Sequence, residues 1–149
     1  MNEIINTLKG LLADNIALKF KAHGYHWNVE GDDFKQFHDF FADIYENYDD
    51  ATDTYAEWLR MLNTYSPYRL TDFFDTSSVG ESVIVGDPQP MLIDLYTEIE
   101  LHIQKLIEAG KLATSLNEFG LANFFADRQT ASQKFCWQIR ASIETEEMD

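Results

Sequence analysis

Histidines and carboxylates are concentrated in one stretch of the chain, residues 23–57, which holds three of its four histidines. His26 and His38 lie at about equal distances in sequence from the Gly31-Asp32 pair. If that pair forms the bend between two antiparallel helices, the two imidazoles come level with each other. Further along, Asp53 and Glu57 are one helical turn apart and therefore share a helix face. Imidazole and carboxylate groups together suit iron or zinc, which helical bundles bind between facing helices.

A single subunit cannot bring all four of these side chains to one ion. His38 and Asp53 fall on the same predicted helix, and at the α-helical rise they are about 22 Å apart along its axis. If the four groups serve one site, two copies of this helix must run antiparallel about a two-fold axis near Glu46-Asn47. Each metal then lies between chains, with imidazoles from one subunit and carboxylates from the other. We therefore expect a homo-oligomer built on two-fold dimers.

The carboxylates of this predicted helix are crowded in a way that favours a cation site. Five of them lie three or four residues apart, away from the apolar stripe: Glu46, Asp49, Asp50, Asp53 and Glu57. Their like-charge pairs cost about 0.2–0.5 kcal/mol each, and Arg60 is the only basic residue placed to relieve them. A bound cation removes this repulsion. The alternative interpretation is a solvated acidic face whose repulsion is screened by water and salt.

Two more residues extend the histidine motif, because Trp27 and Asn28 directly follow His26. Together with His38 and the two carboxylates at the spacings above, the motif resembles the Dps family of mini-ferritins, the DNA-protecting proteins of starved cells. The segment FADRQTASQKFCWQIR is weakly similar to the last helix of that family. The resemblance implies a ferritin-like four-helix bundle and a ferroxidase that oxidises Fe(II), preferably with hydrogen peroxide. It also implies a hollow dodecamer that stores ferric mineral, with the site between subunits as the catalytic centre.

One position departs from the family pattern. Four residues after His38, where many members have an aspartate, stands Ala42, and its neighbour Asp43 points about 100° away on the helix. His23 lies one turn before His26 on the same face. We hypothesise that His23 makes up for the missing carboxylate, either as a metal ligand or beside the ligands. The departure leaves the second iron position and the preferred metal, iron or zinc, open.

Other residues have weaker functional interpretations. Trp27, beside the ligands, and the nearby tyrosines Tyr25 and Tyr45 either intercept radicals that leave the site or simply pack. Near the start of the last helix, Glu118, Asn123 and Asp127 match positions that line the three-fold iron-entry pores of the family. Acids near a helix N-terminus are equally expected from the helix dipole. His102 has no identifiable partner, and we expect it to be structural.

Apolar periodicity predicts the two helices that position the candidate ligands. The first is expected over residues 2–27, with Phe20 in its apolar stripe. The second is expected over residues 33–65, with Asp33 and Gln36 forming a capping box and Phe34 beginning a stripe of aromatic core residues.

A long connection separates these two helices from the remaining two. A short helix is expected at about residues 69–74, within a connection that ends at Gly86. Asp87 as N-cap and Pro88 at the first position start the third helix, which is expected to end at about Leu116. The fourth helix then runs to an acidic tail. A connection of this length lets the third helix cross over, as ferritin-like bundles do, so the expected fold is an all-α four-helix bundle with one short extra helix.

Composition limits the class of protein. The chain has 149 residues, the size of a single domain, and 26 acidic against 11 basic residues give a net charge of −15. This charge argues against a surface for duplex DNA. The single cysteine, Cys136, is expected to be a buried thiol in a reducing cytosol. The sequence has no apolar run long enough for a bilayer and no signal peptide pattern, so we expect a cytoplasmic protein.

Three alternatives to a ferroxidase stay open at this point. A DNA-coating stress protein would need basic residues, yet the N-terminal MNEIINTLKG carries two opposite charges and residues 146–149 are acidic. A di-iron bundle with its site inside one subunit would use Glu-x-x-His, which the chain lacks; Glu98 and His102 have the wrong spacing. A bundle without chemistry would not need the register of the candidate ligands. The sequence does not identify the oxidant, hydrogen peroxide or dioxygen.

Overall fold

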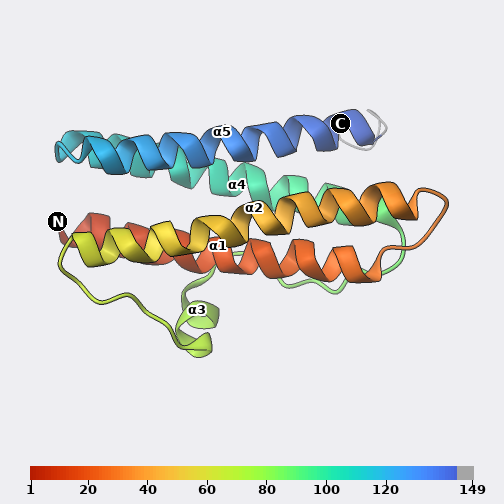
Figure 1. The fold of residues 1–149 in the computed structure, drawn as a ribbon, viewed down its shortest axis with the longest axis horizontal. Helices are drawn as coiled ribbons and strands as arrows, with labels where there is room; N and C mark the ends of the chain where they lie inside the picture. Colours follow the sequence, from red (N-terminus) through yellow and green to blue (C-terminus); the bar gives the residue numbers. More distant parts are fainter. Residues whose placement is uncertain (144–149) are drawn as a thin grey trace.

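The computed structural model describes residues 1–143, and this part of the chain is all-α, as expected. Four long helices form a bundle: α1 (Asn2–Asn28), α2 (Phe34–Met61), α4 (Pro88–Ser115) and α5 (Phe119–Ser142). A short helix, α3 (Leu70–Thr76), lies in the connection between α2 and α4 (Figure 1). Within residues 1–143, no helix combines the length and apolar character that crossing a membrane requires.

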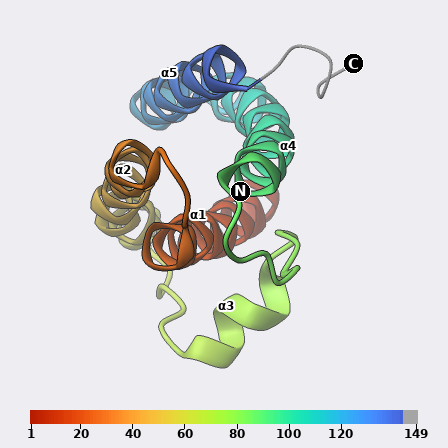
Figure 2. The same ribbon diagram turned by 90° about the vertical axis from the view of Figure 1, so that its right-hand side faces the viewer.

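The connection between α2 and α4 runs along the length of the bundle. α1 and α2 form an antiparallel hairpin, α4 runs in the same direction as α2, and α5 returns antiparallel to α4 (Figure 1). Seen end-on, the four long helices form a ring, and α3 lies outside the ring against α1 (Figure 2). The crossover that the length of the connection predicted is therefore present.

The ends of the helices follow the predicted caps only in part. Asp87 caps α4 as predicted, since its carboxylate accepts a hydrogen bond from the Gln89 backbone N–H at 3.0 Å. The capping box predicted at Asp33 was wrong: Asp33 has φ −102° and ψ 27°, outside the extended conformation of an N-cap, and its side chain makes no capping bond. α2 also ends at Met61 rather than near residue 65. Asn63 adopts the left-handed conformation at φ 66°, which turns the chain away from the helix.

The core consists of two apolar clusters with polar residues between them. One cluster lies toward the α1–α2 turn and the other toward the opposite end of the bundle. The buried polar or charged residues of the described chain are five, which we call the polar layer: Asp14, Asn15, His102, Arg128 and Ser132. Each comes from near the middle of its helix, so the layer crosses the bundle at half its length. His102 is buried, as a structural role requires.

Two aromatic residues expected in the core lie at the surface instead. Phe20 is 53% exposed and Phe34 is 41% exposed, whereas Phe37 and Phe41 of the same predicted stripe are buried. Periodicity identifies an apolar face but does not distinguish a core from a surface that another molecule covers. Cys136 is buried as predicted. The acidic tail that was cited against DNA binding lies outside the described residues.

Candidate functional site

His26 and His38 form a reciprocal pair where α1 and α2 lie side by side. Nδ1 of His26 is 2.6 Å from the carbonyl oxygen of His38, and Nδ1 of His38 is 2.7 Å from the carbonyl oxygen of His26. The two rings are stacked, with centroids 3.8 Å apart and planes 13° from parallel. The prediction that the two imidazoles come level across the bend is therefore confirmed.

These hydrogen bonds fix which nitrogen of each ring is available to a metal. A carbonyl oxygen only accepts, so each Nδ1 must carry the proton and donate it. In a neutral imidazole the other nitrogen, Nε2, then has a free lone pair. A backbone carbonyl that holds Nδ1–H is also the arrangement by which proteins commonly orient a metal-binding histidine. Nε2 is therefore the nitrogen of each ring that is able to bind a metal.

The turn that sets this register is short and is anchored to the rest of the chain. Gly31 has φ +124°, a conformation that strongly favours glycine, and its carbonyl accepts from the Phe34 N–H at 3.1 Å. The backbone of Glu30 donates to the Gly86 carbonyl at 2.8 Å, and Gly86 donates to the Asn28 carbonyl at 3.0 Å. The end of the long connection thus holds the α1–α2 turn from outside. The only sign of this contact in the sequence is Gly86, the glycine before the Asp87 cap. We did not predict that Gly86 pairs with the α1–α2 turn.

Aromatic rings surround the histidine pair. Phe34 stacks on His38 with centroids 4.9 Å apart, and Tyr45 lies 5.3 Å from His26. Trp27 is 61% exposed, so it is not a core residue within this subunit. Phe34 was not predicted as a neighbour of the ligands, whereas Tyr45, which is seven residues or about two turns beyond His38 and therefore on its face, was expected near the site.

His23 lies next to the pair but is held differently. Its ring stacks on the Tyr45 ring with centroids 3.9 Å apart, and its centroid lies 4.1 Å from that of Trp27 and 6.0 Å from that of His26. Its Nδ1 is buried and has no hydrogen-bond partner among the described residues. Burial lowers the pKa of His23, and the charges of Lys19 and His26 lower it further, against an opposing effect of Asp49. His23 is therefore held by an aromatic stack and not by a hydrogen bond at Nδ1.

Asp53 and Glu57 are on the exposed surface of α2, far from the histidine pair of their own chain. The separation between Asp53 and His38 is about 22 Å along the helix axis. Neither carboxylate makes a salt bridge or side-chain hydrogen bond to any residue within 1–143. Arg60, the one basic residue placed to relieve these acids, donates to the Thr64 carbonyl at 3.0 Å and lies over the Tyr65 ring. The acidic residues of α2 from Glu46 to Glu57 therefore have no salt-bridge partner within the described chain.

The remaining candidates are apart from both groups. Glu118 is half-buried at the start of α5 and makes no capping hydrogen bond, and Asn123 and Asp127 are exposed on the first turns of that helix. Ala42 is half-buried and Asp43 is exposed. Across residues 1–143, no three or more histidine, cysteine or acidic side chains converge as a metal site would require. One subunit therefore presents a pair of nitrogen donors and a separate group of carboxylates.

Comparison with known proteins agrees with this architecture. The family model described as a ferritin-like domain matches residues 5–148. The chain is 30% identical over 139 residues to the "DNA protection during starvation protein" of Helicobacter pylori, covering 91% of this chain and 95% of the relative.

Solved structures show the same fold at lower sequence identity. A Dps protein from Vibrio cholerae O1, described as a member of a broad superfamily of ferritin-like diiron-carboxylate proteins, is 21% identical with a TM-score of 0.91, covering 96% of this chain and 90% of that one. Dps from Staphylococcus aureus is also 21% identical, with a TM-score of 0.92 and coverage of 97% of both chains. With a family model spanning nearly its whole length and a relative matched almost end to end, this chain belongs to the Dps family of ferritin-like proteins.

Proposed function

We propose that this protein is a ferroxidase and iron-storing mini-ferritin whose iron sites lie between two subunits. The observation that carries the proposal is the reciprocal pair of His26 and His38, which leaves both Nε2 atoms free while the candidate carboxylates Asp53 and Glu57 of the same chain lie about 22 Å or more away along the helix axis. Nitrogen donors oriented in advance have little purpose in a bundle without chemistry. In this proposal their oxygen ligands come from another molecule.

A second copy of the chain supplies those ligands by symmetry. If two α2 helices run antiparallel about an axis near residues 46–47, Asp53 and Glu57 of each copy come opposite the histidine pair of the other. This arrangement produces two equal sites per dimer. It also brings a cation to the acidic face of α2, whose repulsion no side chain in the described part of the subunit relieves.

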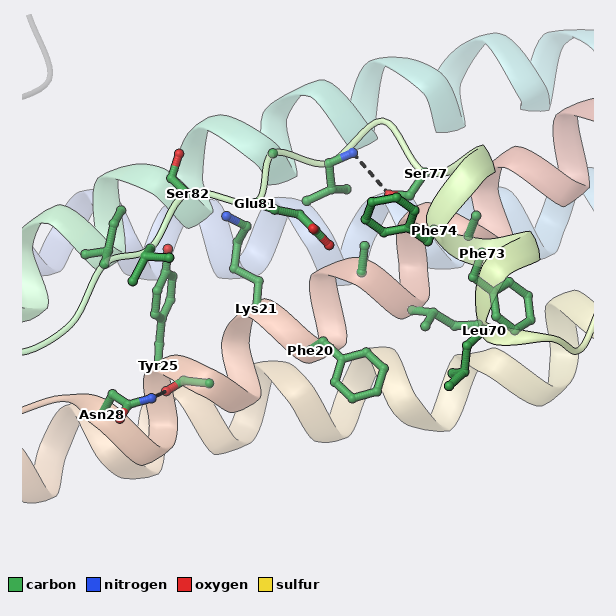
Figure 3. Close-up of a pocket in the computed structure, with 18 of the residues that line it drawn as sticks. Phe20, Lys21, Tyr25, Asn28, Leu70, Phe73, Phe74, Ser77, Glu81 and Ser82 are labelled. Atoms are coloured by element: carbon green, nitrogen blue, oxygen red, sulfur yellow. Dashed lines mark hydrogen bonds between the residues drawn. The ribbon is translucent and has the colours of Figure 1, made fainter.

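Exposed apolar side chains beside the histidine pair support an interface on this face. Phe20 and Trp27 are two turns apart on α1 and are 53% and 61% exposed. Next to them, α1 and α3 border a groove of about 470 Å³, with Phe20, Leu70 and Phe74 at its rim (Figure 3). Contiguous exposed apolar groups of this kind usually mark a surface that a partner covers. We propose that the second subunit is that partner.

The ligands have different roles in the proposed reaction. Asp53 and Glu57 bind Fe(II), the substrate, and neutralise its charge. In this proposal Glu57 also bridges two iron ions. His26 and His38 add nitrogen donors and leave coordination positions open for the oxidant. With hydrogen peroxide, two Fe(II) ions each lose one electron, the O–O bond breaks and its oxygens leave as water or hydroxide. The Fe(III) ions then hydrolyse, releasing protons, and the product is ferric mineral.

Storage requires a closed shell, and we propose a hollow dodecamer assembled from the two-fold dimers. The net charge of −15 attracts Fe(II) to such a shell and does not favour DNA, so we expect no DNA coating. Glu118, Asn123 and Asp127, at the start of α5, are the candidates for an iron-entry pore. The amide of Asn123 in place of an acid makes that pore less negative. Zinc is the alternative occupant of the site when iron is absent.

A crystal soaked anaerobically in Fe(II) tests the proposal directly. Anomalous scattering at the iron edge should place ions within bonding distance of Nε2 of His26 or His38 and of the partner subunit's Asp53 or Glu57. In solution, Fe(II) mixed with hydrogen peroxide should give a fast rise in ferric absorbance, faster than in buffer alone, and sedimentation should give the mass of twelve subunits. Iron bound only at scattered surface acids, with oxidation no faster than in buffer, would refute the proposal.

A further inference from the structure

The face of α1 beside the histidine pair carries a projecting ring and, next to it, a hollow. Phe20 is 53% exposed, so most of its ring is outside the core of its own subunit. One and two turns earlier on α1, Ala17 and Ala13 have small side chains and form the floor of the groove of about 470 Å³ that α1 and α3 border, which we call the α1–α3 groove (Figure 3). Its walls are apolar and include Ile16, Leu70, Phe73 and Phe74.

The register of the proposed dimer brings the ring of one subunit to the groove of the other. His26 and His38 are level where α1 and α2 lie side by side. Counting nine residues from each histidine toward the middle of the bundle reaches Ala17 on α1 and Asn47 on α2, so these two are level as well. The two-fold axis of the proposed shared iron site, on which this step rests, passes near Asn47 and therefore near Ala17. Phe20 lies three residues after Ala17, so the partner subunit's Phe20 comes three residues before it, over the floor of the groove.

A pair of opposite charges supports the same register. Nζ of Lys19 lies 4.5 Å from the centre of the Phe20 ring, so a positive charge accompanies the projecting ring. Lys19 is two residues after Ala17, and the two-fold rotation therefore brings the partner subunit's Lys19 to the level of Asp49 on α2. Asp49 is exposed, and neither it nor Lys19 forms a salt bridge within residues 1–143. One rotation thus places a ring opposite an apolar groove and an ammonium group opposite a carboxylate.

We propose that the Phe20 ring of each subunit inserts into the α1–α3 groove of its two-fold partner, with Lys19 beside it facing the partner subunit's Asp49. A two-fold interface must be self-complementary, so a projecting group and its receptor have to occur on the same surface on opposite sides of the axis. Phe20 and the groove floor meet this condition, because they lie on opposite sides of Ala17. A partner of a different kind would need only the groove and would leave the adjacent exposed ring without a role.

The inserted rings determine the register in which the iron ligands meet. A slip of one helical turn moves a side chain by about 5.4 Å, which exceeds the length of a metal–ligand bond. The acidic face of α2 does not by itself exclude such a slip, since Glu46, Asp50, Asp53 and Glu57 offer a carboxylate at each successive turn. The apolar contact selects one register, and the histidine pair then lies opposite Asp53 and Glu57.

Cross-linking of the assembled, metal-free protein tests the register. A residue on a two-fold axis meets its own copy, so Ala17→Cys should give a covalent dimer in high yield with a short bismaleimide. Gly24→Cys is the matched control, because Gly24 lines the same groove and has open space where a side chain is added. Its two copies would be about 21 Å apart along the helices and should not be joined. The unaltered protein, in which Cys136 is buried, gives the background.

Removing the ring tests the insertion itself. In the Ala17→Cys background, the protein concentration at which cross-linking falls to half reports the stability of the dimer. Phe20→Ala should raise this concentration on the order of 100-fold, because each dimer loses two buried rings. Phe119→Ala removes a ring that is 59% exposed on α5, away from the groove, and should leave it unchanged. Phe20 is itself more than half exposed, so its truncation should not unfold the subunit.

Charge reversal tests the second contact. Lys19→Glu and Asp49→Lys should each raise the same concentration about tenfold, because each places like charges opposite one another. The double variant should restore it, which a change in the folding of either single variant would not do. Additive losses in the double variant would overturn the pairing of Lys19 with Asp49.

The outcomes separate this proposal from that of the shared iron site. Cross-linking at Ala17 that persists unchanged in Phe20→Ala would overturn the insertion and leave the shared site standing. Cross-linking no better at Ala17 than at Gly24 would show that the axis lies elsewhere, and both proposals would then be wrong.

Discussion

The two ends of α2 differ in how far the subunit itself completes them. At the N-terminal end, His38 and His26 fix each other's rings through two hydrogen bonds and present oriented Nε2 atoms. At the C-terminal end, Asp53 and Glu57 are exposed and have no bonded partner within residues 1–143. The histidine end is finished when the chain folds, whereas the carboxylate end is unfinished until something faces it. In our proposal, folding supplies one half of the iron site and assembly supplies the other.

Removing either half should abolish rapid oxidation to the same extent. The double variants His26→Ala/His38→Ala and Asp53→Asn/Glu57→Gln should each lower the peroxide-dependent rate by on the order of 100-fold or more, because each removes all ligands of one kind. The control Asp43→Asn changes an exposed acid on the same helix and should keep the rate. Stopped-flow absorbance of the ferric product measures all three. A site formed by the histidines alone would survive loss of the acids, and that result would break the comparison.

Acid should lower the stability of the fold through the buried side chain of His102. Burial lowers the pKa of His102 to about 4; Asp14 opposes this effect, and Arg128 and Lys105 add to it. Below pH 6.5 the His102 side chain therefore takes up a proton in the unfolded chain, whereas in the folded chain it does so only near pH 4. As the pH falls from 6.5 to 4, the free energy of unfolding should decrease by up to about 3 kcal/mol, and below pH 4 this contribution should stay constant. Denaturant unfolding at several pH values checks this.

His102→Leu should flatten that pH dependence without changing the iron ligands. If the substituted protein loses as much stability between pH 6.5 and 4 as the original, another group controls the acid response. Burial of His102 would then not explain the acid response, and His102 would not differ in this respect from the His26–His38 pair.

Stability should separate the two halves where activity does not. Loss of the histidine pair removes two hydrogen bonds and four aromatic ring contacts, and should lower the free energy of unfolding by about 1–3 kcal/mol. Asp53→Asn/Glu57→Gln removes like-charge repulsion on an exposed face and should leave stability unchanged or raise it by up to about 1 kcal/mol. Urea denaturation without metal gives both values. A large loss of stability in the acid variant would mean that these carboxylates already have partners without iron.

The position of Ala42 offers a way to extend the histidine half. Ala42→Asp adds a carboxylate one turn from His38 and should raise the number of zinc ions bound per site, measured by calorimetry under anaerobic conditions. Asp43→Glu alters the neighbouring acid, which points about 100° away, and should not change that number. Equal stoichiometry in all three proteins would show that Ala42 does not face the metal.

The smallest effect should come from His23. His23→Phe keeps an aromatic ring between Trp27 and Tyr45 and should change the oxidation rate by no more than about twofold, if, as we propose, the stacked ring supports the site without binding metal. His23→Ala should lower the rate further by loosening the stack. If His23→Phe loses a bound zinc ion, His23 is a ligand after all, and the histidine half has three donors.

Local sequence spacing predicted the placement of the histidine pair well. The level placement of His26 and His38 depends only on a turn of known residues between two amphipathic helices, and the cap at Asp87 depends on its own neighbours. The left-handed Asn63 that ends α2 carries no local signal strong enough to override the apolar pattern beyond it. The exposure of Phe20 and Phe34 was missed because a single chain's pattern does not say which apolar face is left for a partner.

Contacts between distant segments were beyond this reasoning. The polar layer joins Asn15, His102 and Arg128, which are separated by dozens of residues and come from three helices, so no window of sequence contains it. The anchoring of the histidine turn by Gly86 has the same origin. Both depend on the path of the crossover, which the sequence indicated only through the length of the connection.

Mixing two inactive variants tests most directly whether the site is shared. His26→Ala/His38→Ala subunits retain the acids, and Asp53→Asn/Glu57→Gln subunits retain the histidines. When the two are unfolded together in equal amounts and reassembled, half of the dimers are mixed, and each mixed dimer contains one intact site. We predict recovery of about one quarter of the original rate, from two proteins that are each inactive when reassembled alone. No recovery, in assemblies of the correct mass, would contradict the account.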